Sequence, residues 1–185
     1  MKRVFDFLAS FLLLLVFLMP FVVIAIAVKL TSKGKVLYWS DRVGKDNVIY
    51  KMPKFRTMNE DTPEIATHLL TDSTNVLTPI GGFLRRYSLD EIPQLWNIFI
   101  GSMSFVGPRP ALYNQDDLIS LRSSRGIDKI LPGLTGWAQV NGRDNLLIIE
   151  KVEKDEEYLR LHSFLFDLKI LWLTIVKVIK KDGVS

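Results

Sequence analysis

The hydrophobic pattern of the chain begins with an uncharged run over residues 7–28, in which Ser10 is the only polar side chain. A straight helix of that length would be about 33 Å long, enough to cross a bilayer. Pro20 lies inside the run and kinks or breaks a helix, because it has no backbone N–H and clashes with the preceding turn. Basic residues flank both ends of the run, whereas a crossing helix attracts them to its cytoplasmic end. The pattern predicts a re-entrant membrane helix broken at Pro20, with a kinked transmembrane helix and a buried core helix as alternatives.

The next patterned segments predict a small β-hairpin followed by an amphipathic helix. Short apolar runs at residues 36–39 and 48–50 flank a turn-like Gly-Lys-Asp-Asn, and residues 52–58 are expected to leave the strand. Ser88 and Glu91 have the spacing of a capping box, which predicts a helix starting near Ser88. Apolar residues recur behind it at helical spacing, and Gly101 is the expected stop.

The remaining chain alternates irregular segments with helices. Two prolines around Arg109 exclude a regular helix over residues 104–110, and residues 131–143 are rich in glycine and turns. Helices are predicted over residues 114–122, 146–158 and 161–181. The last one carries a leucine and tryptophan stripe with lysines elsewhere, which is typical of a helix lying in a headgroup layer. Packing of that stripe on a soluble core is the alternative, and the pattern by itself favours it.

Composition restricts the chemistry to carboxylates and basic side chains. The 185 residues include no cysteine and two histidines, which excludes disulfides, thiolate metal sites and cysteine nucleophiles and leaves little basis for histidine sites. Lys plus Arg is 24 against 20 for Asp plus Glu, a net charge of +4. This mild excess suits an anionic membrane surface or phosphorylated substrates, and it is too small to indicate nucleic-acid binding.

Asp90 and Glu91 are the candidate centre, although adjacent acids in a first helical turn often only complement the helix dipole. Arg85 lies just upstream, Arg109 is fixed within Pro-Arg-Pro, and Arg143 follows Asn-Gly. Arginines held in this way suit phosphate binding. Carboxylates beside them indicate phosphoryl chemistry, in which they either hold Mg²⁺ together with phosphate oxygens or attack phosphorus directly. Spacing alone does not choose between these roles.

Several blocks of the sequence resemble one known family. The blocks are RRYSLDEIPQLWN at residues 85–97, MSFVGPRP at residues 103–110, PGLTGWAQVNGR at residues 132–143, KFRTM at residues 54–58 and FDLKI at residues 166–170. In this order they resemble the bacterial sugar transferases, the monotopic phosphoglycosyl transferases, over essentially the whole chain. The sequence departs from the usual pattern at Met19, where the family often has serine, and at Leu131, where many members have arginine.

The resemblance implies a reaction and assigns residues to it. The family transfers a sugar 1-phosphate from a UDP-sugar to polyprenyl phosphate, typically undecaprenyl phosphate, releases UMP and so initiates a surface glycan such as O-antigen, capsule or glycoprotein. Asp90 corresponds to the nucleophile that forms a covalent phosphosugar ester, and Glu91 to the carboxylate that positions Mg²⁺ or activates the acceptor. The candidate phosphate ligands are Arg85, Arg109 and Arg143, with Lys54 and Arg56 as weaker ones. Residues 51–54 and 110–116 look most like members that act on N-acetylated amino sugars.

The resemblance also implies a place in the cell and an architecture. We expect an α+β, mostly helical monotopic protein with a re-entrant helix over residues 1–32, a catalytic domain over residues 33–185, a small hairpin and interfacial amphipathic helices. It is expected on the cytoplasmic face of the bacterial inner membrane, in contact with lipids, and a homodimer is left open. Two rival functions remain: a membrane-associated metal-dependent phosphodiesterase or pyrophosphatase, and a non-catalytic membrane-anchored binding protein.

Overall fold

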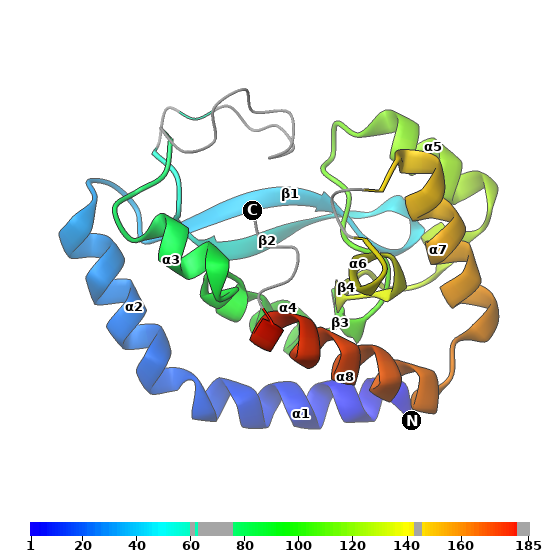
Figure 1. Cartoon of the computed structure of the whole chain (residues 1–185), viewed down its shortest axis with the longest axis horizontal. Coiled ribbons are helices and arrows are strands. Elements are labelled where there is room, and N and C mark those ends of the chain that lie inside the picture. Colours follow the sequence, from blue (N-terminus) through cyan, green and yellow to red (C-terminus); the bar gives the residue numbers. More distant parts are fainter. Residues whose placement is uncertain (60–61, 63–75, 143–145, 181–185) are drawn as a thin grey trace.

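The computed structural model describes residues 1–59, 62, 76–142 and 146–180. A bent pair of N-terminal helices runs along one side of the molecule, and a long β-hairpin crosses above it (Figure 1). Shorter helices and a second, smaller sheet lie between and beside them. The described chain is mostly helical with two small sheets, as the sequence predicted for an α+β fold.

The N-terminal apolar run forms two helices, α1 (Lys2–Val16) and α2 (Leu18–Thr31), which meet at Phe17. Pro20 is the third residue of α2, so its ring faces the carbonyl of Val16 and offers no N–H to it. This explains why α1 ends at Val16. Neither described helix has by itself the length and apolarity that a bilayer crossing requires. The pair has both when taken together, with a bend of 59° between its helices.

Both ends of the helix pair are fastened to the rest of the chain. At the start of α1, the Lys2 ammonium lies 2.6 Å from the Asp167 carboxylate. The Arg3 guanidinium donates to the carbonyls of Ile98 and Phe99 at 2.6 and 2.8 Å. At the other end, Ser32 follows α2, and its hydroxyl and carbonyl accept hydrogen bonds from the Arg56 guanidinium. The two ends therefore lie on the same body of the molecule.

The predicted hairpin is present and longer than expected. Its strands β1 (Leu37–Val43) and β2 (Ile49–Phe55) pair antiparallel around a 3₁₀ turn at Lys45–Asn47. Asp46 and Asn47 have positive φ angles of 55° and 58°, which Asp and Asn tolerate better than most residues. The expectation that the chain leaves the strand at Met52 is wrong. Met52 and Phe55 are both buried on opposite faces of the strand, each in a different apolar cluster, and this packing on both sides extends β2.

The segment after α3 (Gly81–Arg86) differs from the predicted helix. Residues Leu89–Gln94 form a 3₁₀ helix, η3, and only Leu95–Ile100 form the α-helix α4. Pro93 within η3 has no N–H for a longer helical ladder, which is one reason for the interruption. The predicted stop is confirmed, since Gly101 caps α4 in the left-handed conformation.

The C-terminal half packs as short elements around a second sheet. Strand β3 (Ser104–Val106) pairs in parallel with β4 (Gly133–Thr135). Helices α5 (Asp116–Ser124), α6 (Trp137–Val140), α7 (Ile148–Leu161) and α8 (Phe164–Lys180) surround it, with a 3₁₀ turn η4 at Ile127–Lys129. The irregular backbone predicted around Arg109 and the three predicted helices in this half are confirmed within a few residues.

Three apolar clusters hold these elements together. One, formed by Ala111, Leu118, Ile127 and Val152, joins α5, η4 and α7, and the other two both contact Ile92, next to the acidic pair. The larger of these two lies between the hairpin, α4, β3 and α8, and its buried members are Met52, Leu95, Ile98, Met103, Phe105, Val106, Val140, Tyr158 and Ile170. The smaller one joins α2 to β2 and α3 through Ile24, Val28, Phe55 and Leu84. The smaller cluster therefore fixes the strand end and the helix that flank the candidate acidic pair.

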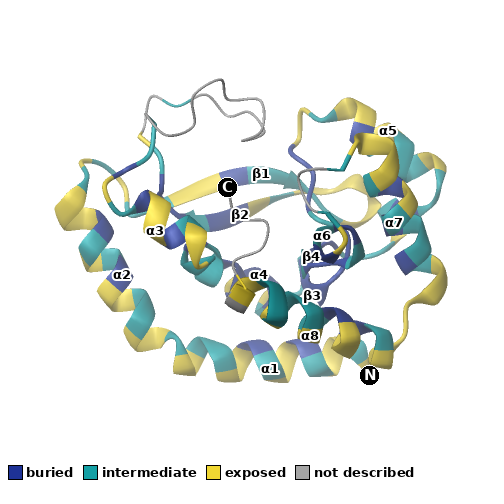
Figure 2. Ribbon diagram, in the orientation of Figure 1, coloured by how far each residue is buried: buried dark blue, intermediate teal, exposed yellow. Residues whose placement is uncertain are grey.

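Large apolar side chains remain exposed along α1, α2 and α8 (Figure 2). Helix α8 contacts the core through the face that carries Asp167 and Ile170, both buried. The outward positions of α8 are Leu165, Leu168, Trp172, Ile175 and Val178. The interpretation favoured by pattern alone, that this stripe packs on the core, is wrong for these five residues. Exposed apolar faces of this extent mark interaction surfaces.

Candidate active site

The turn between α3 and α4 carries the acidic pair. Ser88 adopts the left-handed conformation, with φ 53° and ψ 23°, and its side chain makes no capping hydrogen bond. The predicted capping box is therefore wrong. The Glu91 carboxylate bonds the Lys54 ammonium instead, and the Ser88 amide donates to the Arg85 carbonyl. Asp90 is buried, with an exposed fraction of 7%, so the turn directs this carboxylate into the molecule.

Glu91 joins three segments that are distant in sequence. Its Oε1 lies 2.8 Å from Lys54 Nζ on β2 and 3.8 Å from Arg109 Nη1, in the Pro-Arg-Pro segment after β3. The side chains of Lys54 and Glu91 are 17% and 15% exposed, which shields their ion pair from much of the solvent screening. The structure thus brings two of the predicted phosphate ligands to the acidic pair.

The groups around Asp90 have opposite effects on its pKa. Burial raises the pKa of Asp90 above its usual range, and the neighbouring Glu91 charge raises it further. The charges of Lys54 and Arg85 lower the pKa, but they do not outweigh burial. A carboxylate that is ionised in such a place is poorly solvated, and it gains by reaction with an electrophile or by binding a cation.

Arg85 is held beside Asp90 by the chain that follows β2. Its Nε donates to the Thr57 hydroxyl at 3.1 Å, and one Nη contacts the Met58 sulfur at 3.7 Å. Arg85 lies in the last turn of α3, and Gly81 at the start of this helix lies against the Thr57 carbonyl. The predicted phosphate ligand is thus fixed in direction before any substrate arrives.

Arg56 and Pro20 lie away from the acidic pair. Arg56 is buried, and its guanidinium donates to the carbonyls of Lys35 and Ser32 and to the Ser32 hydroxyl. This arrangement favours a structural role in fastening the end of α2. Arg143 lies outside the described residues. Pro20 lies in α2, where it belongs to the helix bend and not to the acidic site.

The donor set at Asp90 and Glu91 fits Mg²⁺. Among the described residues, no group of three or more acidic or histidine side chains could hold a metal ion on its own. Mg²⁺ is commonly bound by one or two carboxylates, with substrate phosphate oxygens and water completing its shell. Two adjacent carboxylates beside the candidate phosphate ligands Lys54 and Arg109 match this pattern, and a fully protein-enclosed cage is not needed.

The sequence analysis did not identify the residues that fix Arg85 and the backbone of Arg109. Thr57 fixes Arg85, and the buried ion pair of Arg122 with Asp155 reaches the backbone of Arg109. No local pattern could have paired Arg122 with Asp155, because 33 positions separate them and α5 and α7 meet only in the folded chain.

The chain is similar to parts of longer proteins and to proteins of about its own length. The chain is 40% identical to the UDP-glucose:undecaprenyl-phosphate glucose-1-phosphate transferase of Escherichia coli and 38% identical to the undecaprenyl-phosphate glucose phosphotransferase of Komagataeibacter xylinus, over 96% of its length in each case. It spans only 40% and 36% of those two proteins. It is also 36% identical, over its whole length and 90% of the relative's, to the sugar transferase EpsL of Bacillus subtilis.

The family match covers nearly the whole chain. The sequence pattern described as bacterial sugar transferase extends over residues 1–181 and so includes the helix pair, the hairpin and the acidic turn. The relatives align over the same span. The chain belongs to the bacterial sugar transferase family.

Proposed function

We propose that this protein is a phosphoglycosyl transferase that moves a sugar 1-phosphate from a UDP-sugar to a polyprenyl phosphate, with undecaprenyl phosphate as the acceptor. The observation that carries the proposal is the buried Asp90 carboxylate beside Glu91, with Lys54, Arg85 and Arg109 around the pair. The names of the Escherichia coli and Komagataeibacter relatives, both undecaprenyl-phosphate transferases, support the acceptor.

In the first half-reaction, an Asp90 carboxylate oxygen attacks the phosphorus that bears the sugar. A bond forms from Asp90 to that phosphorus, and the bond to the bridging oxygen breaks. UMP leaves with that electron pair, and a phosphosugar ester of Asp90 remains. In the second half-reaction, an oxygen of polyprenyl phosphate attacks the same phosphorus. The diphosphate-linked lipid forms and the Asp90 carboxylate is released.

The neighbouring cations have two roles in this reaction: they favour the ionised form of Asp90, and they bind the donor diphosphate. Lys54 and Arg85 favour the ionised form of Asp90, which attack requires. Arg109 and Lys54, which both contact Glu91, would bind the donor diphosphate. Asp90 and Glu91 would hold Mg²⁺, which offsets charge on the diphosphate when bound. Burial of Asp90 keeps water from competing with the lipid acceptor.

The bent helix pair supports a re-entrant insertion in place of a crossing. A crossing would separate residue 2 from residue 32 by a bilayer, yet both contact the same body through Asp167 and Arg56. We place residues 1–32 in one leaflet and residues 33–185 on the cytoplasmic face, where nucleotide sugars are made. The exposed apolar side of α8 would then lie in the headgroup layer.

Two measurements test the reaction. Asp90→Asn should abolish release of UMP, and wild-type protein given donor without acceptor should retain labelled sugar phosphate covalently. A hydrolase would consume UDP-sugar without polyprenyl phosphate, and a binding protein would release no UMP from any donor. Near-normal turnover of Asp90→Asn would remove this residue as the nucleophile.

The donor sugar is the least constrained part of the proposal. Resemblance at residues 51–54 and 110–116 supports an N-acetylated amino sugar, whereas two relatives carry glucose in their names. A panel of UDP-sugars, each assayed for UMP release with undecaprenyl phosphate present, decides between them. Faster turnover of UDP-glucose than of every N-acetylated donor would overturn the amino-sugar assignment.

A further inference from the structure

The segment that presents Arg109 to Glu91 is held through its backbone. Residues 108–110 read Pro-Arg-Pro, so two of the three have no N–H with which to fix the segment. All three carbonyls accept hydrogen bonds. The donors are the Gly133 amide to Pro108 at 2.9 Å, the Arg122 guanidinium to Arg109 at 2.8 Å and the Arg42 guanidinium to Pro110 at 3.2 Å.

The bond to the Arg109 carbonyl comes from a side chain that is itself fixed. Nε and Nη2 of Arg122 lie 3.0 and 2.6 Å from one carboxylate oxygen of Asp155. The Asp155 side chain is only 1% exposed. Two guanidinium nitrogens therefore bind Asp155 while a third donates to the loop, and the rigid planar fork of arginine sets the angle between these contacts.

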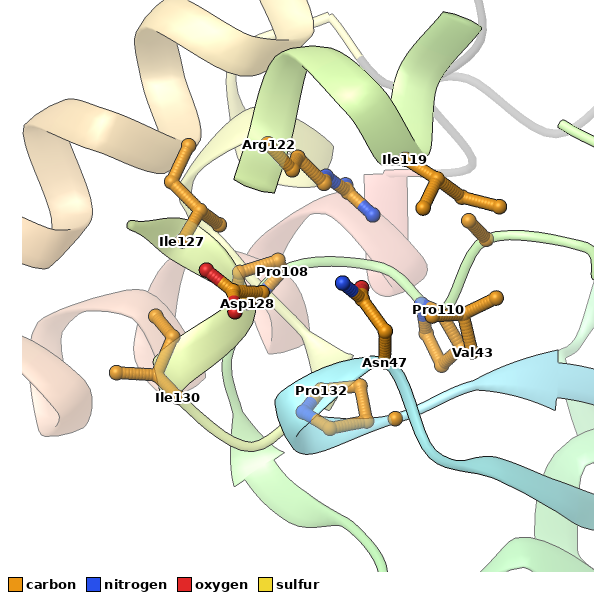
Figure 3. Close-up of a pocket in the computed structure, with 12 residues that line it drawn as sticks. Val43, Asn47, Pro108, Pro110, Ile119, Arg122, Ile127, Asp128, Ile130 and Pro132 are labelled. Carbon is orange, nitrogen blue, oxygen red and sulfur yellow. The ribbon is translucent and has the colours of Figure 1, made fainter. Parts of the chain in front are cut away.

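A small cleft lies beside the segment. Its cavity volume is about 30 Å³, and Pro108, Pro110 and Arg122 are among the residues that line it. Figure 3 shows Arg122 extending from α5 over this cleft, toward the segment that carries Pro108 and Pro110. Pro108 and Pro110 are buried on either side of Arg109, so this packing and the hydrogen bonds to the backbone together set the position of Arg109.

We infer that Arg122 and Asp155 form a positioning pair for the proposed transfer reaction, which holds the Arg109 guanidinium 3.8 Å from Glu91 and toward the donor diphosphate. The inference rests on the proposed function for the role of Arg109. Arg122 touches the Arg109 backbone and Asp155, so it acts through Arg109 and is not itself a catalytic residue.

The same two helices supply a matched control. Arg125 on α5 pairs with Glu156 on α7 at 2.8 Å, and both side chains are about one third exposed. This pair crosses the same helix interface without reaching residues 108–110. Arg125→Lys therefore reports what a general loosening of α5 against α7 does to activity.

The first experiment is a double-mutant cycle on donor turnover. Arg122→Lys keeps the charge and can still pair with Asp155, but it lacks the fork that reaches the Arg109 carbonyl. We expect it to lower kcat/KM for the UDP-sugar by about 10- to 100-fold, since small misplacements near the chemistry have this effect. The same change in an Arg109→Ala background should have little further effect, whereas Arg125→Lys should stay within about 2-fold of wild type. A full loss in both backgrounds, or none in the first, overturns the inference.

The second experiment does not need turnover. Hydrogen exchange of the peptide spanning residues 104–113 should speed up in Arg122→Lys and in Asp155→Asn, and stay at the wild-type rate in Arg125→Lys. Unchanged exchange in both variants also overturns the inference. If exchange is faster in the variants but the wild-type protein turns over no UDP-sugar, then Arg122 and Asp155 do position residues 108–110. That result would overturn the proposed function instead.

Discussion

Lys54 Nζ and Glu91 Oε1 lie 2.8 Å apart, and this ion pair joins the C-terminal end of strand β2 to the turn that carries Asp90. The pair comes from positions 37 residues apart. It places a cation beside two carboxylates that would otherwise repel each other, and it also lowers the pKa of Asp90. The consequences of this pair are measurable in the pH dependence of the reaction.

Lys54→Met should move the acid limb of the kcat/KM profile to higher pH. Attack needs ionised Asp90, and removal of the Lys54 charge takes away the largest influence that lowers its pKa. The pH-independent kcat/KM should also fall, by about 10- to 100-fold, the loss that accompanies about 1.4 to 2.7 kcal/mol of transition-state stabilisation. Both quantities come from initial rates of UMP release measured over a pH series that spans the acid limb.

Lys51→Met is the control for that change. Lys51 lies on the same strand, is 63% exposed and pairs with Asp41, away from the acidic turn. Its profile should match the wild type. An acid limb of Lys54→Met that stays in place, or moves to lower pH, contradicts the electrostatic link between Lys54 and Asp90.

Asp90→Asn should stabilise the fold at neutral pH while it abolishes turnover. Because burial raises the Asp90 pKa in the folded state, this group contributes stability below its unfolded pKa and loses it as pH rises through the folded value. Where the Asp90 carboxyl is ionised, the wild type carries a buried charge that the amide lacks. We expect Tm to rise by roughly 2–4 °C, which corresponds to about 1 kcal/mol in a chain of this size.

The pH dependence separates this cause from a packing effect. The difference in Tm between Asp90→Asn and wild type should shrink as the pH falls, because the wild-type carboxyl becomes neutral as well. Thermal unfolding in detergent at several pH values measures it. A difference that stays constant with pH would assign the stabilisation to packing.

Two neighbouring glycines should respond in opposite ways to alanine. A Cβ at Gly81 would overlap the Thr57 carbonyl oxygen, whereas a Cβ at Gly82 meets only Leu77 at 3.8 Å. Both lie in α3. Gly81→Ala should destabilise the protein by about 1–3 kcal/mol and lower activity, because α3 carries Arg85. Gly82→Ala should be neutral or stabilising by about 0.5–1 kcal/mol, the helix preference for alanine.

Denaturant titration of both variants, with UMP release measured in parallel, checks the docking of α3. Equal stabilities for the two variants would mean that the contact of Gly81 with Thr57 does not constrain the helix.

Single cysteines test the re-entrant placement, since the chain has none of its own. Suitable sites are a cysteine in a short tag before Met1, Lys33→Cys after α2 and Asp117→Cys on the exposed side of α5. All three should resist a membrane-impermeant maleimide in intact spheroplasts and react after lysis. Reaction of the tag alone in intact spheroplasts would show that the helix pair crosses the bilayer.

Local signals in the sequence set many of the elements. Pro20 acts on the carbonyl four residues before it, Gly101 supplies its own left-handed backbone, and Asp46 and Asn47 close the hairpin. Each depends on atoms a few residues apart, so a single sequence reveals it. The capping box failed because Ser88 and Glu91 had competing partners that sequence spacing does not show.

The amino-acid sequence alone predicted the broken apolar helix, the hairpin and the candidate acidic pair. The folded structure was needed to show which cations reach that pair: Lys54 from β2 and Arg109 from the segment after β3 do, while Arg56 turns toward the end of α2. It also decided that the apolar stripe of α8 faces outward. The physical reason is range, because backbone preferences act within a turn or two, whereas ion pairs and burial depend on segments that meet only after the chain has folded.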